Sequence, residues 1–148
     1  MTPSRRVFFS TAATALSAAR VSGANDRVRI GIVGTGGRGS YLMREANKCG
    51  DVQWVAVCDA WDLRRDKALE LTGPGVEKYA DYRRLLDRKD IDGVIVATWD
   101  NNHARISLDA CRAGKDVYVE KPMTSHPLQG PPRVTAVREH RRVLQTGG

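Results

Sequence analysis

Short apolar runs alternate with helix-like stretches along most of this chain. The runs predict strands at Val28–Val33, Val52–Cys58, Gly93–Ala97 and Val117–Glu120, and weaker strands at Glu77–Tyr79 and Val143–Gln145. The strong runs are continuous rather than alternating, and Val94–Ala97 has no polar face, which is typical of a strand that helices cover on both sides. This alternation predicts an α/β fold with a doubly wound parallel sheet.

Apolar residues between the strands recur at helical spacing. The predicted faces consist of Leu42, Ala46 and Cys49 in one helix and of Ala104, Leu108 and Cys111 in another. We expect Asn101 or Asn102 to cap the second of these helices and Gly114 to end it. The segment Gly130–Pro132 has the composition of a loop.

The composition is that of one globular domain, because 41% of the 148 residues are hydrophobic and 28% are charged. No apolar run approaches the roughly 20 residues of a membrane-spanning helix, which excludes an integral membrane protein. Of the 24 Lys and Arg residues, seven lie near the two ends with only two acidic residues beside them. The rest of the chain is therefore almost neutral despite the net charge of +7, which argues against a nucleic-acid partner. The three cysteines lack the spacing of a disulfide framework or a zinc site, and we expect no metal.

Residues 1–24 differ from the rest of the chain. Arg5 and Arg6 precede a short apolar run, residues 10–19 carry no charge, and the small residues Ser22 and Ala24 bracket a plausible cleavage site. This layout resembles a twin-arginine signal peptide and predicts a periplasmic or otherwise exported protein that uses the twin-arginine export machinery. A disordered basic tail or an organellar transit peptide is the alternative.

The segment Gly34-Thr35-Gly36-Gly37-Arg38-Gly39 follows the first predicted strand and opens a predicted helix. Its glycines at 34, 36 and 39 have the spacing of a dinucleotide-binding turn. In such a turn the first permits the tight bend, the second admits a pyrophosphate and the third lets helix and strand pack closely. The N–H groups at the start of the helix would face the phosphates. A purely structural turn is one alternative. A P-loop is another, but it needs Lys where this chain has Ser40.

Asp59 supports the dinucleotide interpretation, because it ends the second predicted strand about 20 residues after Gly39. A carboxylate at this place accepts hydrogen bonds from ribose hydroxyls and repels a 2′-phosphate. We therefore expect Gly37, Arg38 and the three spaced glycines to bind NAD together with Asp59. NADP stays an alternative, because Arg38 and Arg64 could pair with a phosphate there.

Polar residues also follow two later strands. Thr98-Trp99-Asp100-Asn101-Asn102-His103 comes after one, and Glu120-Lys121-Pro122 ends the next. Ligands of an open α/β sheet bind at such carboxyl ends. Lys121 could hydrogen-bond a substrate hydroxyl and favour loss of its proton as a hydride leaves the same carbon, and the alternative is a solvated surface charge. For His103 two interpretations stay open, a ligand contact and a hydrogen bond to backbone or water.

Several motifs together resemble one known family. They are Gly34–Gly39, Val57-Cys58-Asp59, Asp81-Tyr82 leading into Ile91–Val94, and above all the run Ala113–Pro122, which reads A-G-K-D-V-Y-V-E-K-P. Residues 27–148 are similar to the glucose-fructose oxidoreductase/inositol dehydrogenase (Gfo/Idh/MocA) family. The resemblance implies an NAD(P)-binding Rossmann domain followed by a larger α/β domain that holds a sugar or polyol.

By position, the resemblance implies roles for the residues already named. Gly34, Gly36 and Gly39 would contact the pyrophosphate and Asp59 the adenosine ribose. Lys121 would lie beside the nicotinamide and the reacting hydroxyl, with Glu120 and Pro122 fixing the end of its strand. Only Thr98, Asp100 and His103 match the T-P-D-x-W-H loop of many exported members.

Residues 25–148 are thus expected to form the cofactor domain of an enzyme whose substrate domain is absent from this sequence. Three hypotheses stay open: an exported NAD(P)-dependent oxidoreductase of sugars or polyols, an NAD-dependent glycosidase of the same family, and a non-catalytic nucleotide-binding module. By itself the chain is expected to bind a nicotinamide dinucleotide without enzymatic turnover. The longer parent is compatible with a homo-oligomer.

Overall fold

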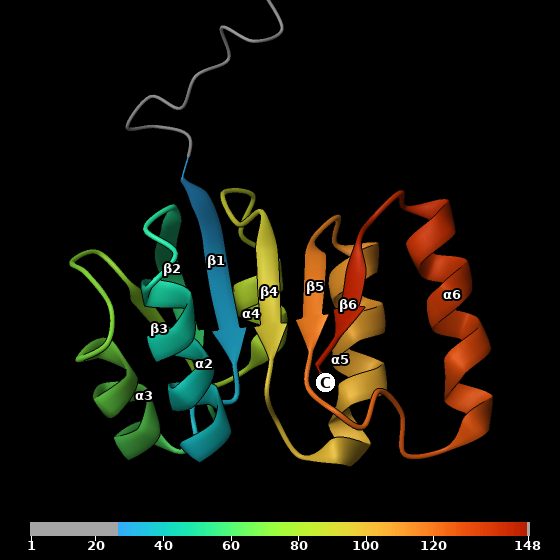
Figure 1. The fold of residues 1–148 in the computed structure, drawn as a ribbon, viewed down its shortest axis with the longest axis horizontal. Helices are drawn as coiled ribbons and strands as arrows, with labels where there is room; N and C mark the ends of the chain where they lie inside the picture. Colours follow the sequence, from blue (N-terminus) through green and yellow to red (C-terminus); the bar gives the residue numbers. More distant parts are fainter. Residues whose placement is uncertain (1–26, 148) are drawn as a thin grey trace, which may run out of the picture.

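Six parallel strands form the centre of the structure, a computed structural model that describes residues 27–147. The strands are β1 (Val28–Val33), β2 (Val52–Cys58), β3 (Glu77–Tyr79), β4 (Gly93–Val96), β5 (Asp116–Val119) and β6 (Leu144–Thr146). They lie in the order β3-β2-β1-β4-β5-β6 (Figure 1). All six predicted strands are confirmed, with ends that differ by at most one residue. The predicted signal segment, residues 1–24, lies outside the described residues.

Helices cover both faces of the sheet, as the continuous apolar runs predict (Figure 1). The helical elements are α2 (Gly37–Asn47), α3 (Asp62–Leu69), α4 (Tyr82–Leu86), α5 (Asp100–Arg112), the 3-10 turn η1 (Pro127–Gln129) and α6 (Gly130–Glu139). One core cluster packs the sheet against α2 and α3, and the other packs it against α4, α5 and α6. In β4, Val94 and Val96 belong to one cluster and Ile95 to the other, so the strand contributes to both cores. Within residues 27–147 no helix has the length and apolar character needed to cross a membrane.

Three local predictions were wrong. Helix α2 ends at Asn47, so Cys49 is exposed beyond it and Met43 fills the core instead. Helix α5 begins at Asp100 without a side-chain cap, which places Asn101 and Asn102 inside its first turn. The segment Gly130–Pro132 is the first turn of α6, not a loop, because proline is tolerated where the backbone N–H has no partner within the helix.

The end of α5 aligns the strand that carries Lys121. Gly114 has a φ of +76°, and the N–H groups of Gly114 and Lys115 donate to the carbonyls of Cys111 and Ala110, at 3.0 Å each. This closing turn confirms the predicted role of Gly114. The buried ammonium of Lys115 then donates to the carbonyls of Arg88 and Ile91, at 2.6 and 2.8 Å. The A-G-K run thus ties α5 to the loop before β4 and sets the start of β5.

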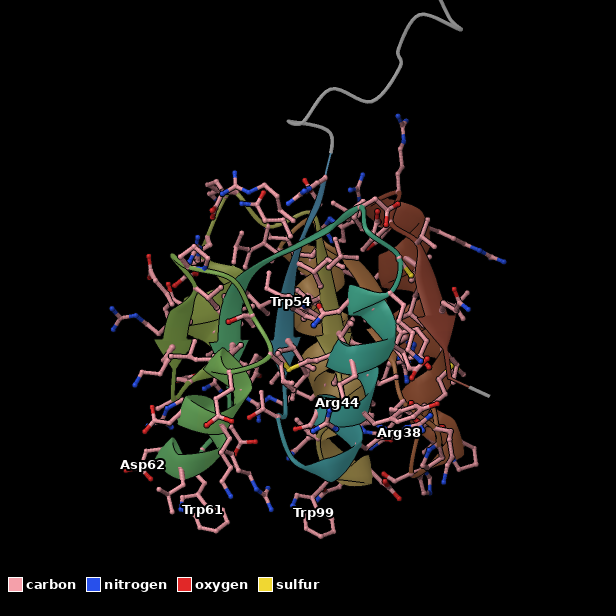
Figure 2. The ribbon with its side chains drawn as sticks, turned by 60° about the vertical axis from the view of Figure 1, so that its left-hand side comes forward. Arg38, Arg44, Trp54, Trp61, Asp62 and Trp99 are labelled. Atoms are coloured by element: carbon pink, nitrogen blue, oxygen red, sulfur yellow. The ribbon has the colours of Figure 1, made fainter. Side chains whose placement is uncertain are left out.

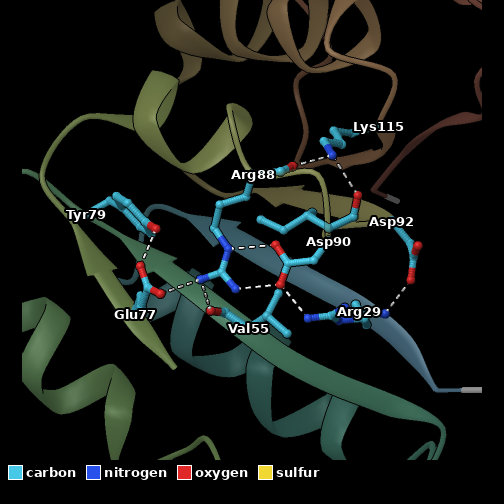
Figure 3. A network of polar contacts seen from close by, with 9 residues as sticks. Arg29, Val55, Glu77, Tyr79, Arg88, Asp90, Asp92 and Lys115 are labelled. Carbon is cyan, nitrogen blue, oxygen red and sulfur yellow. Dashed lines mark hydrogen bonds and ion pairs between the residues drawn. The ribbon is translucent and has the colours of Figure 1, made fainter. Parts of the chain in front are cut away.

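A polar network holds the amino ends of the strands together (Figure 3). Arg88 donates to Asp90 at 2.9 and 2.6 Å and to the carbonyl of Val55 at 2.8 Å. Arg29 also pairs with Asp90, and its backbone N–H donates to Asp92 at 2.8 Å. Hydrogen bonds from Arg88, opposed by partial burial, hold the pKa of Asp90 at about 2. The network lies at the edge of the sheet opposite to the carboxyl ends.

Candidate functional site

A cavity of about 820 Å³ opens at the carboxyl ends of the first four strands. It is lined by the turn after β1, the segment after β2, residues 80–83 after β3, and the segment after β4 with the start of α5. Trp61 and Trp99 lie exposed at this edge, and Arg38 projects from the start of α2 (Figure 2). The position is the one at which open α/β sheets bind ligands.

The glycine turn has two positions that the fold itself requires. A Cβ on Gly34, whose φ is +92°, would lie 2.6 Å from the carbonyl carbon and oxygen of Ala97. A Cβ on Gly39 would overlap the carbonyl oxygen of Gly34, so α2 can approach β1 closely only because residue 39 has no side chain. Both glycines allow close packing of backbone against backbone.

Gly36 is different, because nothing in the protein's own packing demands glycine there. Its φ is −65°, and an added Cβ would meet only the flexible side chain of Arg64, with Nη1 at 3.4 Å. Residue 36 borders the cavity at the start of α2, where backbone N–H groups point outward. The bare backbone therefore leaves room for a ligand and fits a pyrophosphate.

The Asp59 carboxylate is fixed in place by two backbone donors. One oxygen accepts the N–H of Thr35 at 2.9 Å, and the other accepts the N–H of Trp61 at 3.0 Å. The Thr35 hydroxyl also donates to the first oxygen, Oδ2, at 3.4 Å, whereas Oδ1 keeps a second acceptor position with which Asp59 can bind a ribose hydroxyl. Thr35 is buried beneath the turn, and no pattern in the chain predicts that its N–H orients Asp59.

Arginines outnumber carboxylates around the cavity. Arg38, Arg64, Arg83 and Arg105 line it, against Asp59 and Asp81. The backbone N–H of Arg83 and the Arg83 guanidinium, at 3.1 Å, lower the pKa of Asp81. The net positive lining favours an anionic ligand such as a pyrophosphate.

The Arg38 side chain pairs with Glu120, which follows β5, on the opposite side of the site from Asp59. Its Nε and Nη2 bind Oε1 of Glu120 at 2.8 and 2.7 Å, and the other oxygen of Glu120 accepts the N–H of Lys121 at 3.1 Å. Burial opposes ionisation of Glu120, but these hydrogen bonds outweigh it and lower its pKa. Because β1 and β4 separate β5 from β2, Arg38 points away from Asp59. Of the two arginines considered for a 2′-phosphate, Arg38 is thus paired with Glu120, and Arg64 lines the same cavity as Asp59.

His103 links the loop after β4 to the loop after β5. Its side chain is buried, with Nδ1 2.9 Å from the carbonyl oxygen of Pro122 and Nε2 3.0 Å from that of Thr98. Both ring nitrogens thus face backbone and neither is left for a ligand, which favours the backbone interpretation of this residue.

The structure divides the predicted site residues into two groups. Those that line the cavity are Gly34, Gly36, Gly37, Arg38, Asp59 and Thr98, while Gly39 is buried in α2 behind them and does not line it. Those that lie beside it are Asp100, His103, Glu120, Lys121 and Pro122, with Lys121 exposed and Asp100 on a smaller neighbouring hollow that includes Ser125. Sequence reasoning missed Trp61, Tyr82, Arg83 and Arg105 as lining residues. The first three follow the carboxyl ends of predicted strands, which was the available signal.

Metal binding and thiol reactivity at this site depend on its metal-ligating side chains and on Cys58, the one cysteine among the described residues that borders the cavity. Residues 27–147 contain no group of three or more His, Cys, Asp or Glu side chains that could hold a metal ion. Cys58 lies next to Asp59, but burial raises the pKa of its thiol to about 12. It is therefore unreactive at neutral pH.

Comparison with known proteins agrees with this geometry. The model of the GFO_IDH_MocA oxidoreductase family, with its NAD-binding Rossmann fold, matches residues 28–148. The chain belongs to this family. The Gfo/Idh/MocA assignment accounts for a carboxyl-edge cavity with a bare Gly36, an anchored Asp59 and a positive lining, all of which fit NAD.

The relatives of this chain differ in the activity that their names give. An inositol 2-dehydrogenase from Salmonella paratyphi B is 38% identical over 97 residues, which are 65% of this chain and 29% of that protein. A glycosyl hydrolase family 109 protein from Stenotrophomonas maltophilia is 35% identical over 104 residues, 64% of this chain and 23% of the relative. The WlbA dehydrogenase from Chromobacterium violaceum, solved with NADH and UDP-GlcNAcA, has a TM-score of 0.77 at 27% identity, covering 83% of this chain and 35% of that one. The chain thus spans about a third or less of these relatives.

Proposed function

We propose that the chain is the cofactor domain of an exported, NAD-dependent oxidoreductase that acts on a sugar or polyol. The observation that carries the proposal is the position of Lys121, which follows β5 at the carboxyl edge beside the NAD cavity. The 38% sequence identity to an inositol 2-dehydrogenase over 97 residues supports a polyhydroxylated substrate.

The roles of the residues follow from their contacts. The turn from Gly34 to Gly39 and the start of α2 would hold the pyrophosphate, and Asp59 would accept the ribose hydroxyls. Bound NAD supplies the hydride acceptor. Lys121 would hydrogen-bond the reacting hydroxyl, lower its pKa and favour transfer of its proton as the hydride leaves the same carbon, while Glu120 fixes the Lys121 backbone.

NAD is expected to bind better than NADP. The carboxylate of Asp59 would repel a 2′-phosphate, and Arg38 is paired with Glu120 and cannot compensate for it. Titration of the chain with NADH and NADPH tests the preference. Tighter binding of NADPH would show that an arginine, not Asp59, determines the choice.

The proposal that the protein is exported is based on the sequence of residues 1–24, which lie outside the described part of the chain. Replacing both Arg5 and Arg6 by Lys should block export, because the twin-arginine pathway depends on that pair. The measurement is the appearance of a shortened product outside the cytoplasm, with a start near Asn25. Continued export of the double variant would contradict this route.

A glycosidase is the second candidate function, supported by the family 109 relatives at 35% and 36% identity. In a polypeptide that joins this chain to a substrate domain, the two activities leave different products. An oxidoreductase accumulates NADH with a free sugar or polyol. A glycosidase that uses NAD transiently cleaves a glycoside without net NADH, and that result would overturn the first proposal.

A further inference from the structure

Arg64 is a lining arginine of the NAD cavity for which the structure shows no polar partner. Arg38 is paired with Glu120, Arg83 is paired with Asp81, and the neighbouring Arg65 donates to the carbonyl of Asp59 at 2.6 Å. The guanidinium of Arg64 makes no hydrogen bond or ion pair with any residue from 27 to 147. Arg105 also lacks such a partner but is exposed on α5, whereas Arg64 is half-buried.

The half-buried guanidinium of Arg64 has an aromatic neighbour. Its Cζ lies 5.2 Å from the centre of the Trp61 ring, and both residues belong to the segment where β2 leads into α3. A guanidinium over an aromatic face is held by its flat side and keeps its N–H donors free at the edge. Trp61 thus orients Arg64 without using its hydrogen-bonding capacity.

The free donors of Arg64 lie next to Gly36. From the point where a Gly36 Cβ would be, Nη1 is 3.4 Å, Cζ 3.5 Å and Nε 3.8 Å away. This is the bare backbone that no packing within the protein explains. A ligand phosphate seated on residue 36 would therefore have the N–H groups of the α2 start on one side and a guanidinium on the other.

We infer that Arg64 binds the pyrophosphate of the bound dinucleotide. The inference rests on the dinucleotide part of the proposed function and not on its substrate. A phosphate at the 2′ position of the adenosine ribose would offer the same chemistry. Proximity to Gly36 assigns Arg64 to the pyrophosphate, which NAD and NADP share.

Affinity measurements with Arg64→Ala test the assignment on the 148-residue chain. The probes are NADH, NADPH and ADP-ribose, each titrated calorimetrically. We expect the variant to bind all three more weakly by a similar factor of about tenfold, as for a lost charge-assisted hydrogen bond. Arg64→Lys keeps the positive charge but cannot donate two parallel hydrogen bonds, so its affinities should lie between those of wild type and those of Arg64→Ala. Lys67→Ala removes one positive charge from the same helix, away from the cavity, and should leave all three affinities unchanged.

The possible results separate the inference from the function on which it rests. A thermal unfolding midpoint equal to that of wild type shows that Arg64→Ala is folded. Unchanged affinities in that folded variant would overturn the role of Arg64 alone. A loss confined to NADPH would also overturn it, because Arg64 would then bind the 2′-phosphate. Failure of the wild-type chain to bind any of the probes would overturn dinucleotide binding itself.

Discussion

Two glycines of the same turn have different functions, one in packing and one in ligand binding. Gly39 is required because a side chain would strike the Gly34 carbonyl, whereas Gly36 has free space up to Arg64. Gly39 is therefore needed for the stability of the fold, and Gly36 is needed for ligand binding. Substitution at the two positions should separate the two properties.

Gly36→Val is expected to abolish NADH binding while the thermal unfolding midpoint stays near that of wild type. Its side chain would fill the space meant for the pyrophosphate and displace only Arg64. Gly39→Ala should instead lower the free energy of unfolding by about 1–3 kcal/mol, because α2 must move away from β1. Circular dichroism melts and NADH titrations check both. A folded Gly36→Val that binds normally would mean that the turn is only structural.

Buried charge without a counter-charge is a second feature at the residue scale. Arg133 on α6 is 3% exposed, and its Nη1 donates to the carbonyl of Met123. Its Nε and Nη2 have no partner among the described residues, and burial lowers its pKa. Such a guanidinium costs free energy.

Arg133→Met is therefore expected to stabilise the chain. Methionine fills a similar space without a charge, so the unfolding midpoint should rise by a few °C, about 1 kcal/mol or more. Arg138→Met on the exposed side of α6 is the control and should give no such gain. A lower midpoint for Arg133→Met would show that its guanidinium has a stabilising partner.

At the scale of elements, the Arg88–Asp90 network joins the loop before β4 to β1 and β2 (Figure 3). The carboxyl of Asp90 titrates near 3.8 in an ordinary environment and near 2 in the fold, chiefly through its hydrogen bonds to Arg88. A depressed folded pKa means that the carboxylate stabilises the fold above pH 4. That contribution disappears as the pH falls from about 4 to about 2.

Asp90→Asn should consequently be less stable than wild type at pH 7, by about 2 kcal/mol at most, given the shift of nearly two pKa units. Its stability should also fall less steeply than that of wild type between pH 4 and pH 2. Asp66→Asn provides a comparison, because the Asp66–Lys78 pair is exposed and should contribute little. Urea unfolding at several pH values measures all three proteins. Parallel pH profiles for wild type and Asp90→Asn would contradict the role of the pair.

The elements also show where sequence reasoning succeeds and fails. Continuous apolar runs identified the four strong strands β1, β2, β4 and β5, since burial leaves a clear pattern, whereas β3 (Glu77–Tyr79) and β6 (Leu144–Thr146) are short, partly exposed and left a weaker signal. The start of α5 was misplaced because Trp99 precedes the helix and no side chain caps it. The commitment of Arg38 to Glu120, 82 positions away in sequence, was not predictable because it depends on how β5 is placed beside β4.

At the scale of the whole molecule, stability and binding lie at opposite edges of one sheet. The Arg88 network and Lys115 join the amino ends, and the cavity and Lys121 occupy the carboxyl ends. Variants of the network should thus alter stability and leave NADH affinity nearly unchanged.

Lys121 provides a test of the division between binding and chemistry. Hydride transfer needs a substrate oriented against the nicotinamide, and we expect residues 1–148 by themselves to bind NADH without oxidising polyols at an enzymatic rate. In a polypeptide that adds a substrate domain, Lys121→Ala should lower turnover by about a hundredfold, as for a lost proton-transfer group. Its NADH affinity should change little. Full activity of that variant would contradict the assigned role.

The most direct test of the central claim, that the carboxyl-edge cavity binds a nicotinamide dinucleotide, is a fluorescence titration of the chain with NADH. Two of the three tryptophans, Trp61 and Trp99, line the cavity, so bound NADH should quench their emission and itself emit by energy transfer. We predict saturable quenching with one NADH per chain and its reversal by ADP-ribose. Quenching that never saturates, or that ADP-ribose does not reverse, would contradict the account.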